Sequence, residues 1–408
     1  MRYKAATMGF LVMGLLLIPA MAEGTLLIFG NANMDESIDD EDISFLSEII
    51  SGEREPTDLA DADHDGKIDE GDVLRVEEII AGVEEEITLL DGAEGEITIQ
   101  VPVERIVPLN MRHACSLVVL GAEEKIVGVD QTVVERERLF PRLCNLPSVG
   151  AVREPDAEAI ISLQPDLILT FTNMPLPGEL EDKMPAGISV LRFDLSRTES
   201  IEMEMKALGY LMGDREEAAR YLDWYAGYMR EVEERASQIT DRERVFLERE
   251  KKAAGESTVR WAYADQTGYT DLCAAAGGLN IADGYIDCNG DVEAEWVLSQ
   301  NPDVIIGLSY NGGYMVDDPA PLQAYRQEIL SIPGIQNVTA AREGRVYIIS
   351  GDFSIGPQIL IGSATVAKWL YPDVFEDLDV DAIHEEFLRD FMRIEFDPRE
   401  EGAFVYPG

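Results

Sequence analysis

The sequence predicts an α/β fold in which two Rossmann-like lobes are joined by a long helix and preceded by a small all-α module. Three observations support this prediction. A long amphipathic stretch occupies residues 196–240, a helix–turn–strand unit occurs once on either side of it, and an acidic loop occurs twice near the N-terminus. We expect a first lobe at 97–195, a connecting helix at 196–243, a second lobe at 244–373 and a helical tail at 374–408.

The first 22 residues have the pattern of a secretory signal peptide. Arg2 and Lys4 precede an apolar stretch, which ends in the small-residue triplet Ala20-Met21-Ala22. The apolar stretch is short for a membrane span, so we expect cleavage after Ala22, with an uncleaved anchor as the alternative. The protein is therefore expected to work outside the cytoplasm, secreted or associated with the cell surface.

The acidic loop occurs in two copies thirty residues apart, each with oxygen-bearing residues at positions 1, 3, 5, 9 and 12. Oxygen ligands at this spacing wrap a hard cation, and the backbone carbonyl at position 7 adds a further ligand. Calcium is the expected ion. Its predicted ligands are Asn31, Asn33, Asp35, Ser37, Asp39 and Asp42 in the first loop and Asp61, Asp63, Asp65, Lys67, Asp69 and Asp72 in the second, with Ser37 and Lys67 acting through their carbonyls.

A helix with matched apolar residues follows each loop, and no helix leads into it. A loop with only its exit helix, given twice, resembles a dockerin module over residues 25–90. Aspartate at position 12 matches dockerins, whereas Glu36 stands at position 6 of the first loop where Gly66 stands in the second. Because the sharp turn there favours glycine, we expect the first site to be weaker or distorted. The resemblance implies a cohesin-type partner on another protein, and residues 83–96 are expected to form an acidic linker.

The repeated unit of the two lobes reads EAIISLQPDLILT from Glu158 and EWVLSQNPDVIIG from Glu295. A helix ends before the proline, because the residue ahead of proline is pushed out of the α region. The following β-branched and leucine residues are typical of a buried parallel strand. The alternative is that the two units are unrelated parts of one large α/β domain.

The stretch between the copies carries apolar residues at steps of three and four, with acids and arginines at the other positions. This spacing predicts an amphipathic helix. Gly209, Gly213 and Asp214 interrupt the pattern, so we expect a kink or a break into two helices there.

The composition is strongly acidic: 79 acidic residues stand against 33 basic ones in 408 residues, for a net charge of −46. Nucleic acids and anionic membrane surfaces would be repelled. We expect a monomer of two or three domains, because the chain is longer than one core usually organises.

Four cysteines fall as one pair in each lobe. In an exported chain the favoured pairing is Cys115 with Cys144 and Cys273 with Cys288. Four cysteines allow three connectivities, and free buried thiols are a further alternative.

A series of weak motifs in a fixed order follows the acidic module. It runs from SVGAVREPDAEAIISLQPDLILTF through RVFLERE, YTDLCAAAGGLNIADG and EWVLSQNPDVIIGL to GRVYIISGD. Over about residues 97–395 this series resembles the class III periplasmic binding proteins. The resemblance implies capture of a ferric siderophore, haem or cobalamin and its delivery to an ABC importer permease.

In open α/β sheets a ligand binds outside the carboxyl ends of the strands, and two such edges are expected to face each other across a cleft. Aromatic faces with a few arginines suit a large, partly anionic metal chelate. The candidate ligand-binding residues are Asn110, Arg112, His113, Arg153, Phe171 and Asn173 from the first lobe and Tyr263, Tyr269, Tyr310, Tyr314, Asp352 and Phe353 from the second. For each aromatic residue, a place in the core of its lobe is the alternative.

The histidine count separates classes of ligand. Only His64, His113 and His384 are present, in three different parts of the chain. A bare zinc or manganese ion would need several imidazoles and carboxylates in one place, so this class is disfavoured. His113 is a candidate axial ligand of a haem or cobalamin metal, with a polar residue at a helix start as the alternative.

The sequence indicates no enzyme. It contains no nucleophile elbow, metalloprotease helix or phosphate loop. The expected function is solute capture, with a ferric siderophore as first choice and cobalamin or haem as second. A cell-surface assembly protein without a transported ligand is the alternative of another class.

Glu158 and Glu295 stand at the start of the two matched helices. The resemblance to cobalamin-binding relatives implies that one such acid in each lobe docks into an arginine pocket of a permease subunit. The alternative is an acid that the helix dipole favours in a first turn.

Overall fold

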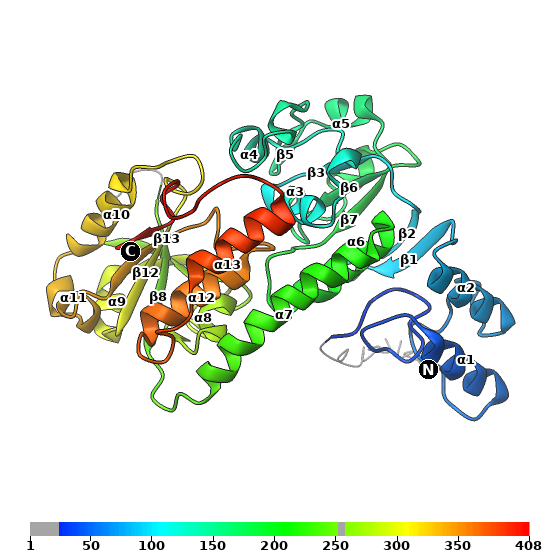
Figure 1. The fold of residues 1–408 in the computed structure, drawn as a ribbon, viewed down its shortest axis with the longest axis horizontal. Helices are drawn as coiled ribbons and strands as arrows, with labels where there is room; N and C mark the ends of the chain where they lie inside the picture. Colours follow the sequence, from blue (N-terminus) through cyan, green and yellow to red (C-terminus); the bar gives the residue numbers. More distant parts are fainter. Residues whose placement is uncertain (1–23, 252–257, 408) are drawn as a thin grey trace, which may run out of the picture.

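The computed structural model describes residues 24–251 and 258–407, so the predicted signal peptide lies outside the described residues. Two separate sheets, both flanked by helices, account for most of the chain (Figure 1). The predicted α/β class is confirmed. No helix in the described part of the chain is both long and apolar enough to cross a membrane.

The N-terminal module (residues 25–90) holds the two acidic loops and the helices α1 (Asp40–Ser51) and α2 (Glu70–Ala81). Both helices begin with a capping box and end at a left-handed glycine, which satisfies backbone groups at both ends. The predicted loop–helix repeat is therefore a structural repeat.

A hairpin crosses the boundary that the sequence places between this module and the first lobe. Strand β1 (Glu86–Leu90) lies where an acidic linker is expected, and it pairs antiparallel with β2 (Glu96–Gln100) at the start of the predicted first lobe. The hairpin is tied to both neighbours: Ile28 bridges to Leu89, and the backbone N–H of Gly92 donates to the carbonyl of Arg192 at 2.7 Å. The prediction of an all-α module ending at a linker was therefore wrong at this end.

The first sheet consists of three parallel strands in the order β3–β6–β7. Its strands are β3 (Ile106–Pro108), β6 (Leu167–Thr170) and β7 (Ser189–Arg192), and the helices around it are α3 (Met111–Val119), α4 (Gln131–Val134) and α5 (Ala157–Leu163). A small hairpin, β4 (Gly150–Ala151) with β5 (Glu154–Pro155), and three 3-10 turns at Glu123–Lys125, Leu143–Asn145 and Glu181–Lys183 complete this part.

The second sheet is mixed, in the order β11–β9–β8–β12–β13–β14, with β10 paired to β8. Its strands are β8 (Arg244–Arg249), β9 (Val259–Tyr263), β10 (Leu279–Asn280), β11 (Asn289–Glu293), β12 (Val304–Ser309), β13 (Val346–Ser350) and β14 (Val405–Tyr406). Its helices are α8 (Gly268–Ala275), α9 (Ala294–Gln300), α10 (Ala320–Leu330), α11 (Thr339–Arg342) and α12 (Ile359–Leu370), with a 3-10 turn at Ile335–Asn337.

The C-terminal tail is only partly helical. It forms α13 (Val380–Glu386) and a π-helical turn (Phe387–Met392), and then returns in extended form to add β14 antiparallel to β13. The prediction of a helical tail over 374–408 was wrong for this last part, because β14 pairs with the open edge of β13.

The connecting segment forms two helices, α6 (Ile201–Met212) and α7 (Arg215–Ser237) (Figure 1). α6 ends at Gly213, whose φ of 75° is left-handed. The helices pack closely at the break, since a Cβ on Gly209 would lie 2.8 Å from the Cβ of Ala218. The predicted break into two helices is confirmed.

The two copies of the repeated unit share their hydrogen bonds. Asp166 accepts from the backbone N–H groups of Glu104 and Arg105, and Asp303 accepts from that of Arg244, so each aspartate anchors the start of the neighbouring strand. In return, the Arg105 and Arg244 guanidinium groups donate to the last carbonyls of α5 and α9. The helix–Pro-Asp–strand prediction is confirmed in both copies.

All four cysteines are free, which contradicts the predicted disulfides. Cys115 is buried in α3 against Gln358 and Met392, whereas Cys144 contacts the carbonyl of Pro141. Cys273 is buried in α8, and the thiol of Cys288 accepts from the side chain of Asn289. The alternative of free buried thiols therefore holds for Cys115 and Cys273, whereas Cys144 and Cys288 are free and half-buried.

Candidate functional site

Three of the predicted tyrosines lie together at the carboxyl edge of the second sheet. Tyr263 ends β9, Tyr269 is in the first turn of α8, and Tyr310 follows β12. The rings of Tyr263 and Tyr269 are 4.6 Å apart, and the hydroxyls of Tyr269 and Tyr310 are 3.2 Å apart. Tyr263 and Tyr269 are buried, while Tyr310 is 44% exposed.

Arg112 reaches these tyrosines from the first sheet. It stands in the first turn of α3, just after β3, where the side chain of Asn110 caps the helix by accepting from the Arg112 backbone N–H at 3.0 Å. Burial opposes its charge, but the three tyrosines raise the pKa of the guanidinium above its ordinary value. Its guanidinium carbon also lies 5.9 Å from the ring centre of Phe171.

A second arginine, Arg249, approaches the tyrosines from the end of β8. Its guanidinium lies over the ring of Trp261 at 4.7 Å, and it interacts with Tyr263, whose pKa is nonetheless raised, chiefly by burial. The indole N–H of Trp261 is buried without a hydrogen-bond partner in the described part of the chain. Arg249 was not among the predicted site residues, although the carboxyl-edge rule applied to RVFLERE would have found it.

We call Arg112, Arg249, Tyr263, Tyr269 and Tyr310 the arginine–tyrosine cluster. Both arginines are half-buried, and within 24–251 and 258–407 neither has a carboxylate at ion-pair distance. Half-buried or buried arginines elsewhere, such as Arg136, Arg197 and Arg260, each pair with an acid. Guanidinium and phenol groups donate hydrogen bonds to anionic oxygen atoms. The cluster is therefore suited to an anionic ligand.

Several predicted ligand residues belong instead to the core. Tyr314 is fully buried and its hydroxyl bonds to His384 at 2.8 Å, and Phe353 packs on the same imidazole. His113 is also fully buried; its Nε2 lies 2.9 Å from the carbonyl oxygen of Phe193, and burial lowers its pKa to about 3. The prediction of a cleft position was wrong for these three residues, and His113 is not placed to serve as an axial ligand.

The remaining predicted residues are scattered. Asp352 is buried in a two-pronged ion pair with Arg136, which leaves its carboxylate already satisfied. Arg153 is exposed in the turn between β4 and β5, and Asn173 is exposed in the loop after β6. The structure thus brings Arg112, with its cap Asn110 and neighbour Phe171, to the tyrosines. In the described part of the chain, neither Arg153 nor Asn173 forms a hydrogen bond or ion pair with these tyrosines.

The two acidic loops offer oxygen atoms where a cation would sit. In the second loop, carboxylate oxygens of Asp61, Asp63 and Asp65 lie within 4.8 Å of one another. Asp72 accepts from the backbone N–H groups of Asp63 and Asp69 at 3.2 and 2.8 Å. Such a set of oxygen donors fits a hard cation such as calcium.

The first loop repeats this arrangement with fewer carboxylates. Asp42 accepts from the backbone N–H groups of Asn33 and Asp39, as Asp72 does in the second loop. The Asn33 amide donates to Asp35 at 2.7 Å, and Glu36 at position 6 pairs with Lys206 of α6 at 3.0 Å. The first loop is therefore less acidic and is attached to a neighbouring helix.

Glu158 and Glu295, the predicted docking residues, both stand exposed in the first turns of α5 and α9. Within the described ranges no ion pair or side-chain hydrogen bond is formed by either of them. The structure thus leaves both carboxylates available to solvent.

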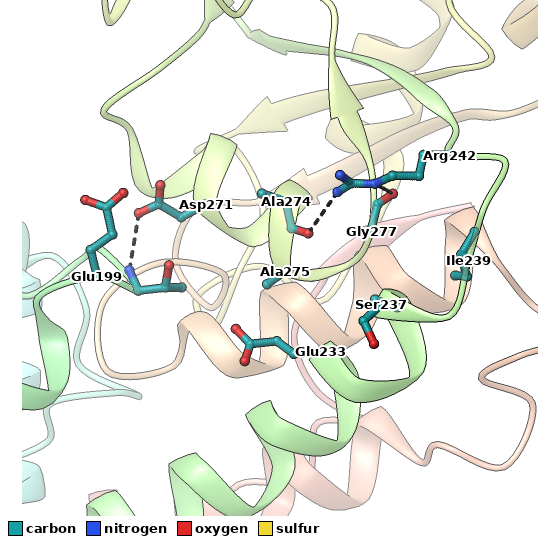
Figure 2. A pocket seen from close by; sticks show the side chains of 11 residues that line it. Glu199, Glu233, Ser237, Ile239, Arg242, Asp271, Ala274, Ala275 and Gly277 are labelled. Carbon is teal, nitrogen blue, oxygen red and sulfur yellow. Dashed lines mark hydrogen bonds between the residues drawn. The ribbon is translucent and has the colours of Figure 1, made fainter. Parts of the chain in front are cut away.

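A cavity of about 430 Å³ lies elsewhere, between α8, the end of α7 and the segment that leads from β7 to α6 (Figure 2). Two of its charged lining groups already have partners: Asp271 pairs with Arg197 at 2.5 Å, and Arg242 donates to the carbonyl of Gly277 at 2.9 Å. Because it includes no member of the arginine–tyrosine cluster, this cavity is separate from the candidate site.

The two sheets thus meet at two arginines and a group of tyrosines, which together offer hydrogen-bond donors to an anionic ligand. Residues 106–352 match the model of the periplasmic binding protein family. The chain belongs to this family, whose members supply ligands to ABC transporters.

The relatives are binding proteins too, in agreement with the prediction of no enzyme. The molybdate-binding protein MolA of Haemophilus influenzae is 26% identical over 352 residues, which cover 76% of this chain and 92% of the relative. A cobalamin-binding protein of Halobacterium salinarum is 26% identical over 54% of this chain and 58% of the relative. The solved structure of the TroA-like periplasmic binding protein FepB from Veillonella parvula matches with a TM-score of 0.63 and 20% identity, over 78% of this chain and 98% of that one.

Proposed function

We propose that the protein captures an anionic metal chelate, with a ferric siderophore as first choice, at the arginine–tyrosine cluster and delivers it to an ABC importer permease. The observation that carries this proposal is the half-buried Arg112, which faces three tyrosines and has no acidic partner in the described part of the chain. In a chain with a net charge of −46, an arginine that lacks an acidic partner is expected to pair with an anionic group of the ligand.

The residues of the cluster favour a chelate over a bare metal ion. His113 and His384 are buried in the core and His64 belongs to the N-terminal module, so the cluster has no imidazole to offer. Aromatic faces cover the apolar parts of a large ligand, while guanidinium and phenol groups donate to its anionic oxygens. Cobalamin and haem are the alternatives.

A smaller oxyanion is a second candidate, because every polar group of the cluster can donate a hydrogen bond. The relative named for molybdate makes this class worth testing. Ferric tris-catecholate, molybdate, cobalamin and haemin are therefore the four probes.

The test is Arg112→Ala, followed by titration of each probe against the fluorescence of Trp261 and its neighbours. Loss of one charge-assisted contact in a shielded site should weaken an anionic probe by tenfold or more, since such contacts contribute about 1.5–3 kcal/mol. Arg153→Ala is the matched control, since Arg153 is exposed and has no ion-pair partner in the described part of the chain. If Arg112→Ala binds every probe with unchanged affinity, the ligand does not bind at this cluster.

A further part of the proposal concerns the N-terminal module. We propose that its loops bind calcium and that the module then attaches to a cohesin-type partner. The five aspartates of the second loop support calcium, because their mutual repulsion is relieved when a divalent cation binds. The resemblance to dockerins supports the partner.

Calcium titration by calorimetry, with hydrogen exchange of residues 25–90 before and after addition of a chelator, tests this part. The module should lose protection without calcium while the two sheets keep theirs, because metal binding is coupled to the folding of small repeats. If the chelator changes no amide in the module, calcium is not part of its structure. A protein that binds calcium and a cohesin but none of the four probes would instead be a cell-surface assembly protein.

A further inference from the structure

Two ion pairs join the segment after α4, near the first sheet, to the part of the chain around the second sheet. Arg136, which follows α4, donates from Nε and Nη2 to the two carboxylate oxygens of Asp352 at 3.1 and 2.8 Å. Arg138 donates to Asp317 at 2.6 and 3.1 Å. Both ion pairs are bidentate, and both connect residues that are more than 170 positions apart in the sequence.

The two pairs differ in their surroundings. The side chains of Arg136 and Asp352 are 13% and 3% exposed, whereas those of Arg138 and Asp317 are 35% and 54% exposed. Salt and water screen an exposed pair strongly, so Arg138–Asp317 contributes little. Separating Arg136 from Asp352 leaves a buried charge without its partner, which is costly. Of these two pairs, Arg136–Asp352 is therefore the one that more strongly resists separation of the segment after α4 from the second sheet.

Each member of this pair is attached to a residue of the arginine–tyrosine cluster. Arg136 also donates to the carbonyl of Thr132 at 2.8 Å, and the Thr132 hydroxyl accepts from the backbone N–H of Met111, next to Arg112. On the other side, Asp352 follows Gly351, against which the ring of Tyr310 packs so closely that a Cβ there would lie 2.5 Å away. The pair thus fixes the distance between the backbones that carry Arg112 and Tyr310.

We propose that Arg136–Asp352 is a latch that holds the two walls of the ligand site together and sets the rate at which ligand enters and leaves. This inference rests on the proposed function only for its effect on ligand. Arg136 and Asp352 act through Arg112 and Tyr310 and are positioning residues. With the latch closed, the site keeps the spacing seen in the structure; with the latch open, the two sheets separate and the ligand can exchange.

The first experiment measures the opening itself. Spin labels at Glu158→Cys and Glu295→Cys, with Cys144 and Cys288 replaced by serine, report the distance between α5 and α9. The double variant Arg136→Gln/Asp352→Asn leaves no buried charge, and we expect a longer or broader distance distribution than in the parent protein. The control Arg138→Gln/Asp317→Asn should leave the distribution unchanged, and the charge swap Arg136→Asp/Asp352→Arg should narrow it again.

The second experiment follows the dissociation of ferric tris-catecholate by stopped flow. The latch variant should release the probe about tenfold faster or more, because changes within one binding site act mostly on the dissociation rate. If no probe binds even the parent protein, the proposed function of the cluster fails, while the distance measurement still decides the latch. A distance distribution and a dissociation rate equal to those of the parent would overturn the latch.

Discussion

At the scale of single residues, Glu204 links the stability of the site's surroundings to pH. Its carboxylate accepts from the backbone N–H groups of Asp194 and Leu195 at 3.1 and 2.7 Å, just beyond β7. Burial first, and then the charge of Asp194, raise its pKa to about 7 from an ordinary value of 4.5. Between these values the folded protein keeps a proton that the unfolded chain has lost, so stability falls as pH rises.

We expect the ionisation of Glu204 alone to lower the free energy of unfolding by about 3 kcal/mol as the pH rises from 4.5 to 7. Glu204→Gln should make the free energy of unfolding less dependent on pH in this range, as measured by urea denaturation at pH 5 and pH 7. Glu216→Gln, an exposed change at the start of α7, is the control. Equal slopes in the parent and Glu204→Gln would show that Glu204 does not titrate there.

The carboxyl-edge rule predicts part of the arginine–tyrosine cluster from the sequence. Arg112 and Tyr269 stand in the first turns of α3 and α8, which follow β3 and β9, and Tyr310 directly follows β12. Tyr314 and Phe353 follow strands as well, yet they turn inward, because β14 and the C-terminal tail cover that side of the sheet. Such a cover comes from residues far away in the chain, so local pattern could not predict it.

At the scale of elements, the N-terminal module is held on the connecting helices. Arg215 at the start of α7 donates to the carbonyls of Ile79 and Ile80 at 2.9 and 3.4 Å, which are among the last of α2. Its guanidinium also lies 4.9 Å from the ring centre of Tyr210. A cation at the end of a helix satisfies free carbonyls and opposes the negative end of the helix dipole.

Arg215→Ala should therefore lower the free energy of unfolding of the N-terminal module by about 1 kcal/mol. The measurement is amide hydrogen exchange, which should become faster in α2. Lys206→Ala removes the ion pair between Lys206 and Glu36, whose side chains are 26% and 70% exposed. Because such an exposed pair contributes little, this substitution should hardly change amide exchange in the module. Comparable effects of the two substitutions would mean that the module is held by general attraction between charges rather than by the helix cap.

The hairpin β1–β2 was the element least visible in the sequence. Its first strand lies within residues 83–96, where acidic residues around a short apolar run predict a solvated linker, and its second strand begins the predicted first lobe. In the structure Ile87, Leu89 and Ile99 alternate inward and join the same buried cluster as Leu46 and Leu208. The cluster runs without a break from the module into the first sheet, and such continuity cannot be read from a short alternating segment alone.

At the scale of the whole molecule, the sequence repeat correctly predicts one helix–turn–strand unit in each sheet. The Pro-Asp turns at Asp166 and Asp303 reappear with matching hydrogen bonds, and each precedes the strand expected for it. The order of the neighbouring strands was not predicted: in the second sheet β9 and β14 run opposite to β8, β12 and β13, whereas the first sheet is all parallel. Strand order depends on contacts between distant segments, for which a single sequence holds no signal.

The repeat also places one exposed glutamate beside each sheet. Glu158 and Glu295 occupy equivalent first turns of α5 and α9, both are exposed, and in the described part of the chain neither is engaged in an ion pair. A transporter with two similar subunits would meet one carboxylate on each half of this protein, at a spacing fixed by α6 and α7.

Glu158→Arg combined with Glu295→Arg should therefore abolish uptake through the cognate importer while leaving the affinity for the bound probe unchanged. Arginine is a stronger test than alanine at these two positions. An introduced arginine would be repelled by an arginine pocket on the permease, whereas alanine would only lose the contact. Glu216→Arg is the matched control: it too is an exposed acid in a first helical turn, but on α7 between the two sheets. Uptake and probe binding are measured side by side in all three proteins. If the double variant still supports uptake, the two glutamates serve only the helix dipoles of α5 and α9.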